Sequence, residues 1–199
     1  MTTRRLVADA ASITATPHQR VAVVGPRGRG KTTLVKALER CARVGVLHIQ
    51  TAALWPYADA ATGVLHGACT YTHLKSVPPV VGGLIVVDGA EYDMWRMGAD
   101  GGNRAACIEA VAGYRGPAAL VMTAQTAADV PRAVRESLTT LVLATAVLAD
   151  RGEVAKLVQW WPRLKPLLAA AARDAHGEHE FCVLDVRDGV ETEYMYVRA

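Results

Sequence analysis

One stretch of eight residues restricts the possible folds of this chain more than any other feature. Gly25-Pro-Arg-Gly-Arg-Gly-Lys31-Thr32 fits the pattern GxxxxGK[ST], follows the apolar run Val21–Val24 and opens a segment of helical composition, Lys31–Arg43. In this pattern the glycines let successive backbone N–H groups point inward at phosphate oxygens, and the positive end of the following helix adds to the attraction. The sequence therefore predicts a phosphate-binding loop between a buried strand and a helix.

The residues of this loop have distinct expected tasks. Lys31 is expected to reach the β- and γ-phosphates of ATP, and Thr32 to offer its hydroxyl to Mg²⁺. Arg27 and Arg29 occupy spacer positions, where solvated charge is the expected role. The full set of expected nucleotide-binding residues is Gly25, Pro26, Arg27, Gly28, Arg29, Gly30, Lys31, Thr32 and Thr33.

Positive charge is concentrated around the loop. Residues 1–43 hold nine basic and two acidic side chains, a charge of +7, whereas the whole chain carries only +3. A net charge this small excludes a protein that binds nucleic acid through overall charge alone. The excess in residues 1–43 is therefore interpreted as a bias toward phosphate around Gly25–Thr32.

Apolar runs and helical segments alternate along the chain. Strands are expected at 21–24, 45–49, 84–87, 118–123 and 141–146. Helices are expected over 31–43, from about 103 to 114, from near 131 and over 154–175, where Pro162 and Pro166 are expected to restart the helix. Phe181–Asp185 and Glu191–Val197, around Asp188-Gly189, predict a β-hairpin, and Thr51–Pro79 is expected to hold little regular structure. This order predicts an α/β fold with a mostly parallel sheet between two layers of helices and a C-terminal β-hairpin. Residues 1–19 are expected to form an N-terminal extension and residues 20–199 a single domain.

Two further classes of protein are disfavoured. The four cysteines lie far apart with no CxxC pair, so that we expect reduced thiols and neither a zinc site nor a disulfide framework. No apolar run reaches the roughly 18–20 residues that span a bilayer, so no integral membrane segment is expected. His176 and His179 have the spacing of a metal pair, but Gly177 breaks the helix between them and no third ligand is evident, so a metal site there is rejected.

Polar residues follow two of the predicted strands. Asp88 follows Leu84–Val87 and is the candidate carboxylate for Mg²⁺, which we expect it to hold through a water in the usual manner of such sites. Gln125 directly follows the run 120–124, at a position where an amide can sense the γ-phosphate or hold the attacking water. Hydrolysis also needs a group that orients or deprotonates this water, and because Gly89 follows Asp88, Glu91 is the candidate, with a solvated loop carboxylate as the alternative.

The segment Leu120–Leu143, LVMTAQTAADVPRAVRESLTTLVL, resembles the one that follows the Walker B strand in FtsK- and HerA-type ATPases. Both consist of an apolar strand, a Gln, polar residues, a Pro, a short helix and another apolar strand. Together with GPRGRGKTT and LIVVDGAEY, the segment is similar to the viral branch of that superfamily, the genome-packaging ATPases of membrane-containing icosahedral viruses and large DNA viruses. The resemblance covers Arg20 to Asp185 and implies a RecA/FtsK-like P-loop NTPase fold. Gly89 departs from it, because the family usually has an acidic residue there.

The resemblance also implies a function. It implies an ATPase that uses ATP and Mg²⁺ to translocate viral double-stranded DNA, irrespective of sequence, into a preformed capsid. It implies a homo-hexameric ring that contacts capsid-vertex or membrane proteins, located in the host cytoplasm and at the packaging vertex of the virion.

In such a ring an arginine of the neighbouring subunit completes the ATP site. Arg115 is the first candidate and Arg135 the second, with Arg104 and Arg132 behind them. Lys75 and Arg96 are available for DNA phosphates, although solvated charge is the expected role of each. Trp160 and Trp161 are expected in the core or at an interface rather than as a base-stacking platform.

Two alternative functions remain open. A small-molecule P-loop kinase fits the length, and Thr51–Pro79 could hold its substrate-binding insertion, but the region after Gln125 lacks an arginine-bearing lid. A nucleotide-dependent switch with weak hydrolysis is favoured if Gly89 means that the site lacks a catalytic carboxylate.

Overall fold

The computed structural model of the chain describes residues 6–7, 13, 18–41, 46–50, 65–66, 84–88, 108–109, 111–174, 177, 179–187 and 194–198. At residues 6–7, 46–50, 65–66, 88 and 194–196 it describes the backbone only. The expectations for Lys75, Glu91, Arg96, Arg104 and His176 lie outside the described residues, as does most of Thr51–Pro79.

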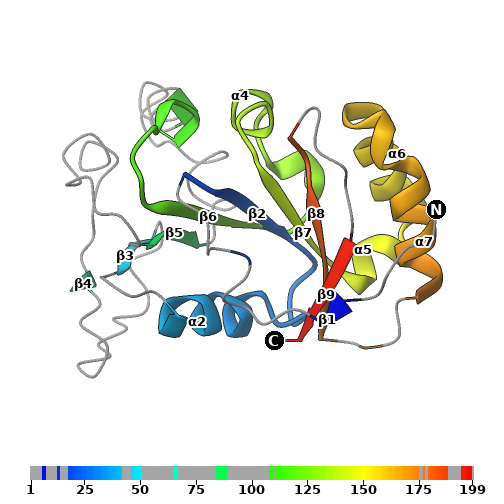
Figure 1. The fold of residues 1–199 in the computed structure, drawn as a ribbon, viewed down its shortest axis with the longest axis horizontal. Coiled ribbons are helices and arrows are strands. Elements are labelled where there is room, and N and C mark those ends of the chain that lie inside the picture. Colours follow the sequence, from blue (N-terminus) through cyan, green and yellow to red (C-terminus); the bar gives the residue numbers. More distant parts are fainter. Residues whose placement is uncertain are drawn as a thin grey trace.

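The described strands form one sheet of nine, in the order β1-β9-β8-β7-β2-β6-β5-β3-β4 (Figure 1). They are β1 (Leu6–Val7), β2 (Arg20–Val24), β3 (Val46–Gln50), β4 (Leu65–His66), β5 (Leu84–Asp88), β6 (Ala119–Ala124), β7 (Thr140–Ala144), β8 (Glu180–Asp185) and β9 (Tyr194–Arg198). Neighbouring strands are parallel except where β8 pairs with β7 and with β9. The predicted mostly parallel sheet and the C-terminal antiparallel strand pair are confirmed.

Helices flank both faces of this sheet. They are α2 (Lys31–Cys41), α4 (Arg132–Arg135), α5 (Thr145–Ala149), α6 (Arg151–Trp160) and α7 (Lys165–Asp174), with 3₁₀ turns η2 (Ala127–Asp129) and η3 (Pro162–Leu164). The connection from β2 to β3 through α2 and the connection from β6 to β7 through α4 run in opposite directions along the sheet. Because parallel crossovers are right-handed, these two helices lie on opposite faces, as Figure 1 shows with α2 below the sheet and α4 above it.

The middle of the sheet forms the core. Every residue of β2, β6 and β7 is buried. Strands covered on both faces have continuous apolar runs rather than alternating ones, which is why Val21–Val24 and Leu141–Leu143 could be recognised from the sequence. A rigid, fully paired centre holds the ends of these strands in fixed positions.

Two of the boundaries that differ from the prediction have an identifiable physical reason. Strand β7 ends at Ala144 and α5 begins at Thr145, two residues before the expected strand end at Ala146. The run from 141 to 149 is almost wholly apolar in both elements, so hydrophobicity alone could not locate the change. Helix α6 begins three residues before the expected Val154, because the Asp150 carboxylate accepts the backbone N–H groups of Gly152 and Glu153 as an N-cap.

The segment before residue 20 contributes to the sheet and the core. Strand β1 pairs with β9 in parallel, and Ile13 is 1% exposed. The division of the chain at residue 20 stays a prediction.

Candidate functional site

The predicted phosphate loop leaves the sheet at its centre. Strand β2 lies between β7 and β6, and the Gly25 N–H donates to the Ala124 carbonyl at 3.0 Å, directly after the last residue pair of β2 and β6. Residues 25–30 then connect β2 to α2. In an open parallel sheet this edge, at the carboxyl ends of the strands, is where ligands bind.

Glycine is required in this loop for two different reasons. Gly28 and Gly30 have φ values of +75° and +84°, in the left-handed region that residues with a Cβ rarely adopt. Gly25 is required for space, because a Cβ there would lie 2.6 Å from the Cβ of Ala144. Apart from Gly28 itself and its two chain neighbours, the described residues place no atom within 4 Å of where a Cβ at Gly28 would stand, so the loop is open at this point.

Lys31 folds back over the loop. Its ammonium group donates to the carbonyl oxygens of Gly25 and Pro26, the latter at 3.1 Å. The first turn of α2 contains no acidic residue, and its first i to i−4 bond joins the Leu34 N–H to the Gly30 carbonyl at 2.9 Å. Helix geometry leaves the preceding amides without an intrahelical carbonyl, so this end of α2 is positive. The open loop, the lysine and the helix end together fit a bound polyphosphate.

Three neighbouring strands bring the other candidates to the same edge. Asp88 is the last residue of β5, and Gln125 follows the last residue of β6, which lies between β5 and β2. Thr32 is exposed in the first turn of α2. A hydroxyl at the helix start and a carboxylate-bearing residue at the end of β5 are the oxygen donors that Mg²⁺ prefers.

The segment after Gln125 is held by carboxylates. Asp129 accepts the N–H and the hydroxyl of Thr126 at 2.9 and 2.8 Å, which fixes the shape of η2. Glu153 on α6 accepts the N–H of Ala127 at 2.7 Å. Sequence reasoning missed Glu153, and no motif marks it, because its partner lies 26 positions away in the chain.

Arg115 and Arg135, the first two candidates for the arginine that acts on a neighbouring subunit, have different surroundings. Arg115 is exposed, lies before β6 and donates to the carbonyls of Ala112 and Tyr114 at 2.8 and 2.9 Å. Arg135 stacks on the ring of Trp160, with its guanidinium carbon 3.7 Å from the ring centroid, and donates to the Val130 carbonyl at 3.1 Å. Burial, followed by the charge of Arg132, lowers the pKa of Arg135. Its contacts within the chain favour a structural role, whereas Arg115 is accessible from outside.

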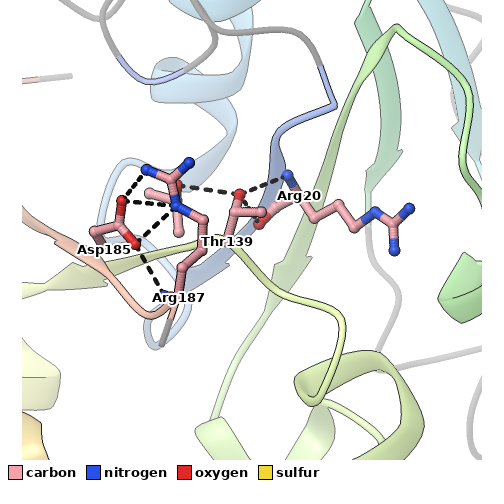
Figure 2. A network of polar contacts seen from close by, with 5 residues as sticks. Arg20, Thr139, Asp185 and Arg187 are labelled. Carbon is pink, nitrogen blue, oxygen red and sulfur yellow. Dashed lines mark hydrogen bonds and ion pairs between the residues drawn. The ribbon is translucent and has the colours of Figure 1, made fainter. Parts of the chain in front are cut away.

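A separate polar network fastens the opposite end of the central strands (Figure 2). The Arg20 N–H donates to Thr139 Oγ1 at 2.9 Å, and the Thr139 N–H donates to the Arg20 carbonyl at 2.9 Å. Beside them the Asp185 carboxylate binds the guanidinium and the N–H of Arg187. Figure 2 shows the Arg20 guanidinium pointing away from Asp185. This network aligns β2 with β7 and lies at the end of β2 remote from the phosphate loop.

The residues of the described ranges hold neither a metal-binding cluster nor a membrane-spanning helix. No three His, Cys, Asp or Glu side chains gather there into a group that could hold a metal ion. Among the helices of those ranges, none is both long and apolar enough to cross a bilayer.

Comparison with known proteins gives a clear result for the fold only. No protein-family model and no curated protein matches the sequence. The genome-packaging NTPase B204 of Sulfolobus turreted icosahedral virus 2, in complex with ATP-gammaS, matches with a TM-score of 0.58 and 14% identity, over 89% of this chain and 96% of its own. The DNA-packaging ATPase B204 of Sulfolobus turreted icosahedral virus matches with a TM-score of 0.57 and 13% identity, over 90% and 97%.

A protein of another class has a similar fold. The pCW3 conjugation coupling protein TcpA matches with a TM-score of 0.52 and 12% identity, over 89% of this chain and 59% of its own. The chain therefore has a fold similar to that of these viral genome-packaging NTPases and of this conjugation coupling protein.

Proposed function

We propose that this chain is an ATP-hydrolysing motor that translocates viral double-stranded DNA into a preformed capsid. It acts as a homo-hexameric ring at the packaging vertex, in the host cytoplasm and then in the virion, where it contacts capsid-vertex or membrane proteins. It binds DNA without regard to sequence, through the phosphates.

One observation carries this proposal. The open phosphate loop, the end of β5 at Asp88 and the end of β6 at Gln125 meet at one edge of a sheet whose fold is that of genome-packaging NTPases. Structural neighbours of this chain were solved with ATP-gammaS, AMP and AMPPCP, which supports ATP as the nucleotide. The structural match covers nearly the whole length of these packaging NTPases.

The roles of the residues follow from their chemistry. The loop amides and Lys31 bind the β- and γ-phosphates, for which Lys31 exchanges the carbonyls of Gly25 and Pro26 for phosphate oxygens. Thr32 and Asp88 hold Mg²⁺, which when bound neutralises charge on the phosphates. Glu91 accepts the proton of the attacking water, and Gln125 orients this water.

Arg115 acts in trans on the ATP of the neighbouring subunit. It is exposed, and its present partners are backbone carbonyls, which bind it less strongly than a phosphate does. An arginine supplied by a neighbour stabilises transition-state charge and can be worth about 10³-fold or more in rate.

Phosphate release from ATP, with and without duplex DNA, tests the proposal. The wild-type chain is expected to hydrolyse ATP without a small phosphoryl acceptor and faster with DNA, and Lys31→Ala to reduce the rate by about a hundredfold or more. A rate that requires a small acceptor would indicate a kinase. ATP binding with no hydrolysis, unchanged by Glu91→Gln, would indicate a nucleotide-dependent switch.

Mixed subunits test the ring and Arg115. Lys31→Ala and Arg115→Ala subunits are each expected to be inactive alone. In an equal mixture, about one interface in four is expected to be active, because it pairs an intact Lys31 with an intact Arg115 of the neighbour. Arg132→Ala is the matched control, because Arg132 is also an exposed arginine and its guanidinium is bound to Glu136 at 2.7 Å. Mixing without recovery, or an Arg132→Ala variant as inactive as Arg115→Ala, would contradict the assignment of Arg115.

A further inference from the structure

We propose that Glu153 is a positioning residue of the ATPase site, which holds the backbone after Gln125 in register with the phosphate loop. This inference rests on the proposed function, because it concerns the same site. Glu153 belongs to α6, an element in which the sequence analysis found no functional residue.

Gln125 lies between two hydrogen bonds that fix it from both sides. On the residue before it, the Ala124 carbonyl accepts the N–H of Gly25 at 3.0 Å, which joins the end of β6 to the phosphate loop. Two residues after it, the N–H of Ala127 donates to Glu153 Oε2 at 2.7 Å. The chain between these bonds is short, so the position of Gln125 relative to the loop depends on both.

The bonds between Asp129 and Thr126 cannot replace Glu153. Asp129 binds Thr126, but both belong to the same turn, three positions apart, so these bonds fix the shape of the turn and not its place. Glu153 is 26 positions away and belongs to a different element, so its bond fixes the turn relative to the rest of the domain.

The Glu153 carboxylate is itself firmly held. Its side chain is 11% exposed, and its second oxygen, Oε1, accepts from the ammonium group of Lys156 at 2.7 Å. The backbone N–H of Glu153 donates to the Asp150 cap at 3.2 Å. One carboxylate oxygen thus faces the surface, and the other faces the buried amide of Ala127. Because a carboxylate accepts a hydrogen bond from an amide more strongly than a neutral group does, this contact holds the Ala127 backbone firmly.

The same helix holds the segment at a second point. Near the far end of α6, Trp160 carries the stacked guanidinium of Arg135 from α4, and Arg135 also binds the Val130 carbonyl. The segment from Thr126 to Arg135 is therefore fastened along α6 near both ends. Of these two points, Glu153 is the one close to Gln125.

Two substitutions break this contact from opposite sides. Glu153→Ala removes the acceptor. Ala127→Pro removes the donor, and the backbone conformation is compatible with proline because Ala127 is the first residue of η2 and Thr126 before it is extended, with φ −127° and ψ 159°. Each is expected to lower kcat for ATP hydrolysis by about tenfold to a hundredfold, as a displaced catalytic group does, with little change in KM for ATP because the phosphate loop is untouched.

Matched controls separate this effect from general damage. Glu153→Gln keeps an oxygen that can accept the Ala127 N–H and is expected to retain kcat within about threefold. Lys156→Met removes the surface partner of Glu153, whose charge also acts on Asp150 and Asp129, but leaves the bond to Ala127 in place, and is expected to behave like the wild type. In a Gln125→Ala background, Glu153→Ala and Ala127→Pro should lower kcat no further, because a residue that acts through Gln125 has no effect once its amide is gone.

The outcomes distinguish this inference from the proposed function. A wild-type chain without ATPase activity would refute the function itself. A chain that is active, sensitive to Gln125→Ala, and further slowed by Glu153→Ala and by Ala127→Pro in that background would refute the inference alone. A fall in kcat with Glu153→Gln or Lys156→Met as large as with Glu153→Ala would also refute it.

Discussion

Replacing Gly25 by alanine tests why the phosphate loop begins with glycine. The φ of Gly25 is not in the left-handed region, so a side chain is not excluded by backbone conformation. It is excluded by space, because the new Cβ would lie 2.6 Å from the Cβ of Ala144, which precedes α5. The backbone cannot retreat freely, because the Gly25 N–H is bonded to the Ala124 carbonyl.

The size of the effect follows from this contact. Carbon atoms pack at roughly 3.5–4.0 Å, so the alanine methyl needs about 1 Å more than the structure provides. Forcing a methyl group into a packed interior typically costs about 1–3 kcal/mol. In a chain of this length, each kcal/mol lowers the unfolding temperature by about 2–4 °C.

A second substitution should reverse the effect. Without the Ala144 methyl, the nearest remaining atoms to the new Cβ are the Cα and N of residue 144, at the ordinary contact distances of 3.8 and 3.9 Å. Gly25→Ala with Ala144→Gly is therefore expected to be more stable than the sum of the two single changes by about 1–2 kcal/mol. Gly28→Ala is the matched control, because its cost of about 1 kcal/mol comes from φ, and Ala144→Gly should not reduce it.

Urea unfolding of the three single and two double variants, together with the wild type, measures these energies. Equal stability of Gly25→Ala and the wild type would show that the loop accommodates the methyl group. A double variant no more stable than the additive sum would show that Ala144 is not what excludes a side chain at position 25.

Two further predictions concern residues outside the loop. Burial raises the pKa of Cys182 to about 12. Alkylation at pH 8, followed by mass spectrometry, should therefore modify the exposed Cys41 and leave Cys182 unmodified until denaturant is added. Rapid labelling of Cys182 in the native protein would contradict its buried position. Burial alone would raise the pKa of Asp185, but the hydrogen bonds and charge of Arg187 outweigh it and lower the pKa. A lowered folded-state pKa stabilises the fold above the unfolded-state value, about 3.9, and this contribution is lost as pH falls through the folded-state pKa, so Arg187→Met should lower the urea midpoint at pH 7 and approach the wild type near pH 3. A difference that stays constant over this pH range would refute the role of Asp185.

Much of the fold could be predicted because each central strand contains a continuous apolar run. Strands buried on both faces are mostly apolar, and a phosphate loop must stand between a strand and a helix, so both are visible locally. The prolines at 162 and 166 were equally informative, because η3 begins at Pro162 and Pro166 lies in the first turn of α7. The end of β7 at Ala144 could not be located, because its apolar run continues into α5 without a change in composition.

In the candidate site too, some residues could be identified from the sequence and some contacts could not. Lys31 and the loop glycines belong to one contiguous motif, and Asp88 and Gln125 each stand directly after an apolar run. Arg135 is the second candidate for the arginine that acts in trans, but its stacking on Trp160 depends on how α6 packs on α4.

By itself the sequence determined the phosphate loop, the strands that surround it and the superfamily resemblance, because these depend on residue type and short spacing. Only the tertiary structure decided which distant groups complete the site: Ala144 against Gly25, and Glu153 on the amide of Ala127. The physical reason is that a close approach or a hydrogen bond between residues many positions apart is set by the packing of whole elements. Such packing leaves no periodicity or motif at either residue.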